Sequence, residues 1–112
     1  MNASNLWNKL LNLAKQSDFE IHTVPQNKSI PLWFQVRVQG DSLIIHNASS
    51  HSPSVKLSNE RKISFKDFEF VYSYYDRWLK GETGIRHEVS RKSQNTAYIF
   101  GLIHEASKHK VM

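Results

Sequence analysis

The chain has 112 residues, no cysteine and a formal net charge of +5, with 15 Lys and Arg against 10 Asp and Glu. This length suits one domain, residues 1–112, with a single modest core, and the lack of cysteine excludes a disulfide framework and a thiolate metal site. The chain shows neither a signal peptide nor an apolar run long enough to span a membrane, so we expect a soluble cytoplasmic protein. The positive charge favours polyanionic partners such as DNA or RNA.

The N-terminal half predicts a helix followed by antiparallel strands. Residues 4–16 carry apolar side chains at helical spacing, and Ser4 is the candidate N-cap. Residues 18–23 alternate apolar and polar side chains, as a short strand does. The clearest β pattern is Leu32–His46, where two alternating segments flank a turn at Gly40, so we expect a hairpin with one face on the helices.

A polar, Ser-rich segment, residues 47–62, separates this hairpin from the C-terminal half. Its composition predicts a loop, with a brief strand at residues 55–57. A loop of this length is uncommon in so small a domain unless it has a role of its own.

The segment Ile63–Leu79 holds seven of the thirteen aromatic residues and predicts the central helix, residues 64–80. Ser64 is a good N-cap, and Gly81 suits the position just past the C-terminus. The main apolar stripe of this helix recurs at steps of three and four residues, which is one face of a helix. That stripe consists of Phe68, Val71, Tyr72, Tyr75, Trp78 and Leu79.

Phe70 and Tyr74 lie on the flank of this helix, outside its main apolar stripe. Two interpretations are open. Either the helix is sandwiched between two elements and both rings are core, or they form an interface with a partner chain, including a second copy in a homodimer.

Residues 95–108 predict the last helix, with Ile99, Leu102 and Ile103 facing inward. Gly101 falls in the middle of this helix, where glycine costs about 1 kcal/mol relative to alanine. We therefore expect a close helix–helix crossing at Gly101.

The segment Gly84–Ile103 resembles a helix-turn-helix, although the usual glycine of the turn is absent. In that motif the N-terminus of the second helix enters the major groove. Asn and Gln side chains pair with adenine, a Thr methyl contacts thymine, and cations neutralise phosphates. The predicted nucleic-acid-binding residues are Arg86, Arg91, Lys92, Gln94, Asn95 and Thr96. The alternative is a solvated loop in which Ser93 or Asn95 only caps a structural helix.

Local catalytic motifs are lacking. The six histidines show no metal-ligand spacing, and the glycines form neither a P-loop nor a dinucleotide fingerprint. We expect no catalytic residues, metal or cofactor, although a small hydrolase assembled from distant residues stays open.

The sequence therefore predicts an α+β domain. It consists of an N-terminal helix, a small antiparallel sheet of two to four strands built on hairpin 32–46, and a C-terminal helical part on helices 64–80 and 95–108. The predicted function is nucleic-acid binding by residues 84–103. The alternative is a protein-interaction or homo-oligomerising module without catalytic activity.

Overall fold

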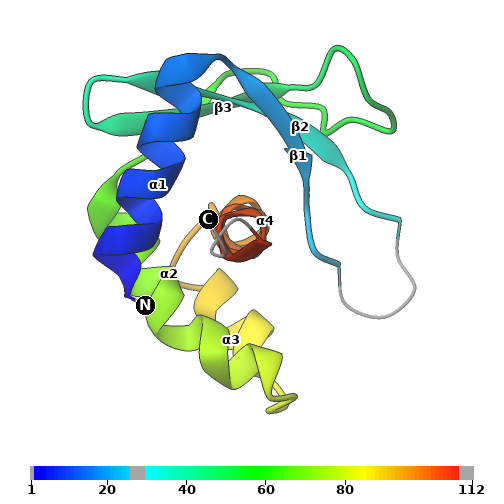
Figure 1. Ribbon diagram of the computed structural model, residues 1–112. Helices are drawn as coiled ribbons and strands as arrows, with labels where there is room; N and C mark the ends of the chain where they lie inside the picture. Colours follow the sequence, from blue (N-terminus) through cyan, green and yellow to red (C-terminus); the bar gives the residue numbers. More distant parts are fainter. Residues whose placement is uncertain (1, 26–29, 109–112) are drawn as a thin grey trace.

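The computed structural model describes residues 2–25 and 30–108. The predicted α+β class is confirmed: an N-terminal helix precedes a four-stranded antiparallel sheet, and three helices follow the sheet. Figure 1 shows the sheet above and the helices below it. The elements are α1 (Ala3–Gln16), β1 (Phe19–His22), β2 (Trp33–Gln39), β3 (Ser42–Asn47), β4 (Arg61–Ile63), α2 (Phe65–Leu79), α3 (Ile85–Ser90) and α4 (Thr96–Lys108).

The sheet is a meander in which the strands lie in chain order, β1-β2-β3-β4. The predicted hairpin is confirmed, and Gly40 occupies its turn with φ of +61°, a left-handed conformation that glycine adopts without strain. Strand β4 was not predicted, because its three residues show no alternation long enough to recognise. It pairs with β3 and leads directly into α2.

Helix α1 starts one residue earlier than predicted. Its N-cap is Asn2, whose side-chain oxygen accepts a hydrogen bond from the backbone N–H of Asn5 at 2.9 Å, so the expectation of Ser4 as the cap is wrong. Trp7 packs the buried face of α1 against α2, and its ring centre lies 5.1 Å from the ring centre of Phe68.

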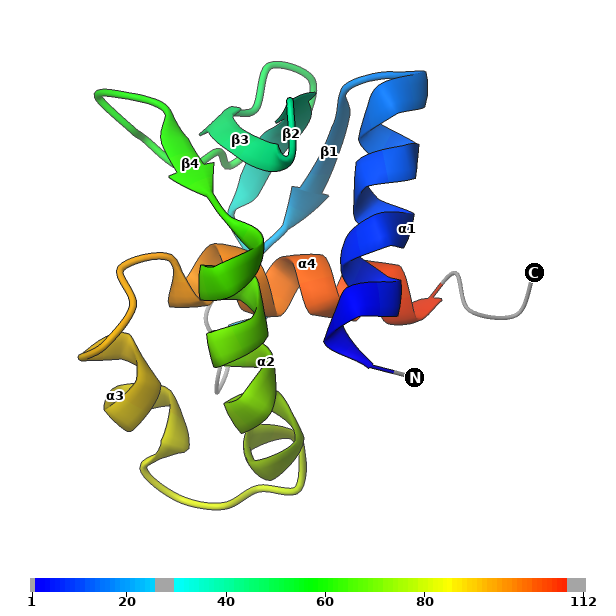
Figure 2. The same ribbon diagram turned by 90° about the vertical axis from the view of Figure 1, so that its left-hand side faces the viewer.

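Helix α2 begins as the sequence predicts. Ser64 is its N-cap and accepts a hydrogen bond from the backbone N–H of Asp67 at 3.3 Å. Phe68, Val71 and Tyr75 are buried against the rest of the core. Figure 2 shows α1 and α2 side by side, with α4 crossing behind them.

Helix α4 is the central element of the fold, and Figure 1 shows it end-on in the middle of the molecule. Gly101 permits the position of α4. The sequence predicted a close crossing with another helix at this glycine, but the close approach is to the sheet. A Cβ atom at Gly101 would lie 2.8 Å from the backbone oxygen of His22 and 3.3 Å from the ring of Phe34. Only a residue without a side chain lets α4 lie this close to β1 and β2.

The Ser-rich loop between β3 and β4 is attached to β1 by one carboxylate. Glu20 accepts hydrogen bonds from the backbone N–H groups of Ser49, Ser50 and His51, and from the His51 ring at 2.8 Å. Desolvation pushes the pKa of Glu20 upward, but these hydrogen bonds outweigh it and lower the pKa to about 2. Beyond this anchor, residue Ser54 forms a β-bridge with Trp33 and so extends the sheet, close to the brief strand predicted at residues 55–57.

No helix among the described residues has the length and apolar character needed to cross a membrane.

We expect Gly101→Ala to lower the free energy of unfolding, although alanine is the better helix former. The gain in propensity is about 1 kcal/mol. The overlap with the backbone of β1 costs about 2–3 kcal/mol, because a backbone oxygen cannot easily move aside, so a net loss of about 1–2 kcal/mol should appear in urea unfolding. Ser107→Ala, on a partly exposed position of the same helix, is the control and should change stability little. A Gly101→Ala variant as stable as the native chain would contradict the close approach.

We expect Glu20→Gln to destabilise the protein by about 1–2 kcal/mol at pH 7, because an amide accepts the loop hydrogen bonds more weakly than a carboxylate. The native pKa of Glu20, about 2, lies below its ordinary value of 4.5, so this stabilisation is present above pH 4.5 and is lost as the pH falls toward 2. Urea unfolding at several pH values should therefore show the two proteins converging in acid. The exposed Glu69→Gln on α2 is the control. A stability gap that stays constant down to pH 2 would be inconsistent with this role.

Candidate nucleic-acid interface

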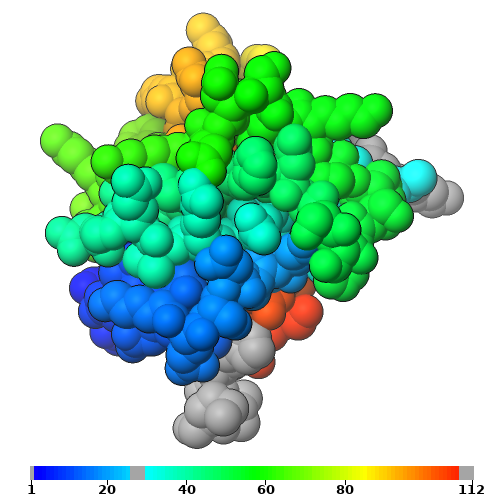
Figure 3. All heavy atoms as spheres, turned by 90° about the horizontal axis from the view of Figure 1, so that it is seen from above, coloured from blue at the N-terminus to red at the C-terminus, as the bar shows by residue number. Residues whose placement is uncertain are grey.

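The turn between α3 and α4, residues 91–95, is held by the first turn of α2. Asp67 Oδ1 accepts a hydrogen bond from Ser93 Oγ at 2.8 Å, and Asp67 Oδ2 accepts one from Asn95 Nδ2 at 3.0 Å. A weaker contact joins the turn to β4, where Arg61 Nη1 donates to the backbone oxygen of Gln94 at 3.3 Å. Figure 3 shows this part of the chain, in orange, beside the green segment that contains β4.

Two of the predicted nucleic-acid-binding residues are engaged within the fold. Arg86 Nη1 donates to the backbone oxygen of Val24 at 2.6 Å, and its guanidinium lies 4.9 Å from the ring centre of Phe100. Burial lowers the pKa of the Arg86 guanidinium. Thr96 is 3% exposed, and its hydroxyl donates to the backbone oxygen of Ser93 at 2.9 Å. These side chains brace α3 and the start of α4.

Helix α4 itself is enclosed by the fold. A recognition helix needs a free face at its N-terminus to reach base edges. Here the buried residues of α4 are Thr96, Ile99, Phe100, Gly101, Leu102, Ile103 and Ala106. The helix therefore lacks the broad exposed face that insertion into a major groove requires.

The other predicted residues lie at the surface. Arg91, Lys92 and Gln94 are exposed, while Asn95 is half-buried because its amide is bonded to Asp67. The backbone of Asn95 also opens α4, since its carbonyl accepts from the N–H of Ile99 at 2.9 Å. Asn95 is thus the residue from which α4 starts, while its side chain bonds to Asp67 and Arg61.

The structure brings Lys92 together with Phe70 and Tyr74, the two residues that the sequence assigned to a separate interface. Lys92 Nζ lies 6.0 Å from the ring centre of Tyr74, and the Phe70 and Tyr74 rings meet edge to face at 5.4 Å. Phe70 is 36% exposed and Tyr74 is half-buried. Neither ring is part of the interior in the way that Phe68 is.

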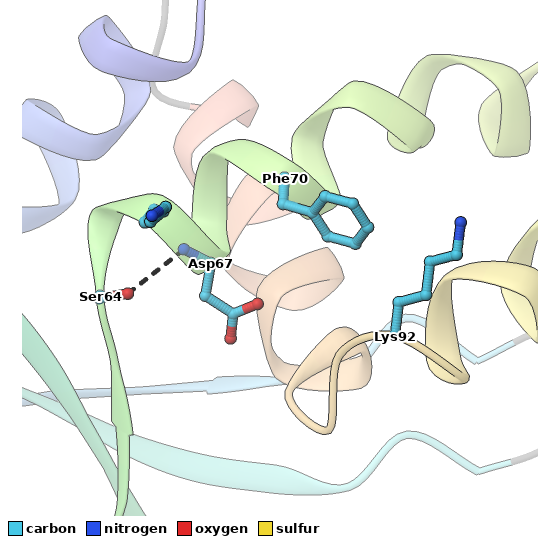
Figure 4. A pocket seen from close by; sticks show the side chains of 5 residues that line it. Ser64, Asp67, Phe70 and Lys92 are labelled. Atoms are coloured by element: carbon cyan, nitrogen blue, oxygen red, sulfur yellow. Dashed lines mark hydrogen bonds between the residues drawn. The ribbon is translucent and has the colours of Figure 1, made fainter.

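Lys66 completes this group. It stands four residues before Phe70, so the two share a face of α2, and both line an open hollow of about 530 Å³ with Ser64, Asp67 and Lys92. Figure 4 shows the Phe70 ring facing Lys92 across this hollow, with the Asp67 carboxylate on the same side of α2. We call Lys66, Phe70, Tyr74 and Lys92 the basic–aromatic surface.

The basic–aromatic surface carries the positive charge of Lys66 and Lys92, whereas the cation beyond Tyr74 is neutralised by a carboxylate. Arg77 continues the stripe beyond Tyr74, with its guanidinium 5.7 Å from the ring centre, but it pairs with Glu82. The hydrogen bond from Arg77 lowers the pKa of the Glu82 carboxyl. No salt bridge forms to Lys66 or Lys92 within the described part of the chain. These two ammonium groups are free to bind an anion.

The sequence pattern did not single out Lys66 or Asp67, which lie in the first turn of α2, as site residues. The spacing of residues 66, 70, 74 and 77, which places two aromatic residues between two cations on one helical face, was the available signal. The contact with Lys92 was not available, since it depends on how α3 packs against α2.

Within residues 2–25 and 30–108, no group of three or more His, Cys, Asp or Glu side chains is arranged to hold a metal ion. Comparisons with protein-family models, with curated proteins and with solved structures find no match for this chain.

We expect Asp67→Ala to lower the free energy of unfolding by about 2 kcal/mol, because the Ser93 and Asn95 side chains lose a charged acceptor in a half-buried place. Hydrogen exchange should quicken most at residues 93–97. Asp76→Ala is the matched control, since its pair with Lys80 is exposed and should contribute at most about 0.5 kcal/mol. Equal effects of the two variants would show that Asp67 does not hold the turn.

Proposed function

We propose that this protein binds single-stranded nucleic acid, DNA or RNA, through the basic–aromatic surface. The observation that carries this proposal is that Lys66 and Lys92, from two elements that are distant in the sequence, line one open hollow with the exposed ring of Phe70, which faces Lys92. Proteins that bind single strands combine cations for the phosphates with aromatic rings on which bases stack. The net charge of +5 supports a polyanionic partner.

A single strand suits this surface better than a duplex. Bases of a duplex are stacked on each other and cannot reach the ring of Phe70, whereas bases of a single strand can leave the stack. The enclosed position of α4 argues in the same direction, because readout of a duplex in the manner of a helix-turn-helix needs that helix to be free. Arg91 and Gln94, exposed in the adjoining turn, extend the contact with the strand.

The alternative occupant is a second copy of the chain, covering Phe70 and Tyr74. A two-fold interface sets the same patch of both subunits face to face. Such an interface would gather four ammonium groups, Lys66 and Lys92 of both copies, in one patch, where like charges oppose association. The free cations thus favour an anionic partner over self-association. Light scattering of the concentrated protein tests this: a stable dimer that dissociates in Phe70→Ala would favour the alternative.

The test of the proposal is fluorescence anisotropy with labelled oligothymidylate and oligouridylate. We expect Lys66→Gln with Lys92→Gln to weaken binding about tenfold at low salt, and to lower the slope of log K against log salt by about 1.4, since each lost phosphate contact contributes about 0.7 for a single strand.

The control is Lys15→Gln with Lys56→Gln, which removes the same charge from exposed positions in α1 and in the loop after β3. It should leave the salt slope unchanged. Equal losses in both double variants would mean that net charge alone attracts the strand, and an absence of salt-sensitive binding by the native chain would refute the proposal.

A further inference from the structure

The hollow beside α2 is lined by a carboxylate, which is unexpected in a site that binds phosphate alone. Asp67 lines this hollow together with Lys66 and Lys92, and its carboxylate repels phosphate. Its two oxygens accept one hydrogen bond each from within the protein, from Ser93 and from Asn95. A carboxylate offers about four acceptor positions, so each oxygen keeps capacity for one further donor.

We propose that this hollow binds guanine, with Asp67 as the residue that selects the base; this inference rests on the proposed function. A carboxylate accepts two parallel hydrogen bonds from a pair of adjacent donors, in the way it accepts the fork of an arginine. Guanine presents such a pair, N1–H beside the N2 amino group. Adenine and cytosine set a ring-nitrogen acceptor beside their amino group, and uracil and thymine flank one N–H with two carbonyl oxygens. The carboxylate repels those acceptors.

The other lining residues supply the rest of a nucleotide site. Phe70 offers its exposed ring for the flat face of the base, and stacking of a base on an aromatic side chain contributes about 1–3 kcal/mol. Lys66 and Lys92 line the same hollow, and their ammonium groups suit the phosphate. The hollow is open to solvent, so a base can enter it from the surface.

The way Asp67 is held also suits a residue that discriminates between bases. Its backbone is fixed by the hydrogen bond to the N-cap Ser64, and its side chain is fixed by the turn between α3 and α4. A carboxylate held on a helix by these contacts loses little side-chain freedom when a ligand binds, which favours discrimination between ligands.

The experiment varies the ligand and leaves the protein intact. Guanosine 5′-monophosphate and inosine 5′-monophosphate differ only in the N2 amino group, so their phosphates contact the cations equally. In NMR titrations of the ¹⁵N-labelled chain we expect guanosine 5′-monophosphate to bind about tenfold more tightly, which corresponds to one charge-assisted hydrogen bond. The largest shifts should fall on the amides of Lys66, Asp67, Phe70 and Lys92. Equal affinity for the two nucleotides, binding matched by inorganic phosphate, or shifts centred elsewhere would overturn the inference.

Variants separate the base contact from stacking. We expect Asp67→Asn to reduce the preference for guanosine over inosine 5′-monophosphate to less than about twofold, because an amide cannot accept both donors. Phe70→Ala should weaken both nucleotides alike, by about tenfold. Leu79→Ala, which shortens another exposed apolar side chain of α2, is the control and should change neither affinity. A guanosine preference that survives in a folded Asp67→Asn variant would also overturn the inference.

Two oligothymidylates, one with a central guanine and one with a central hypoxanthine, distinguish a base within a strand from a free nucleotide. Tighter binding of the guanine strand places the recognised base in a strand. Strand binding with no such preference would overturn the guanine inference and leave the proposed function standing. Selective binding of guanosine 5′-monophosphate without strand binding would refute the proposed function and keep the hollow as a mononucleotide site.

Discussion

The close passage of α4 over the sheet is the contact on which the rest of the structure depends. At Gly101 the helix backbone lies so near β1 and β2 that a methyl group would overlap the carbonyl of His22. This places Phe100 in the interior, where its ring contacts Tyr75 edge to face at 5.3 Å. It also sets the start of α4 beside the start of α2, so the packing of one helix on the sheet determines where the candidate site forms.

The site grows out of that placement. Because α4 begins next to α2, Ser93 and Asn95 lie within hydrogen-bonding distance of Asp67, and the turn that contains them brings Lys92 toward Phe70. The side chains of Ser93, Asn95 and Thr96 are buried or half-buried, whereas those of Lys66, Phe70 and Lys92 are exposed. The same short segment therefore contributes both to the interior and to the surface: Thr96 is buried, whereas Lys92 is exposed.

Cations in this protein divide by their partners. Arg37 pairs with Glu60 and Arg77 pairs with Glu82, while Arg86 lies over aromatic rings and binds a backbone carbonyl. Among the described residues Lys66 and Lys92 form no salt bridge, although Lys92 lies 6.0 Å from the ring centre of Tyr74, and both line one hollow. The net charge of the sequence does not distinguish paired cations from unpaired ones, since an arginine bonded within the fold and an exposed lysine each contribute one positive charge.

Local interactions let the sequence by itself determine the α+β class, the hairpin around Gly40 and the span of α2. Side-chain periodicity, a Ser64 cap and a glycine turn act between residues a few positions apart. The short strand β4, the pairing of Glu20 with the loop after β3, and the true reason for Gly101 depended on contacts between distant segments. The candidate site depended on them as well: Phe70 and Lys92 were recognised separately, but only the packing of α3 and α4 against α2 placed them on one surface with Lys66 and Asp67. Periodicity shows which face of a helix is buried, whereas the neighbour that meets its flank is decided by how the helices pack.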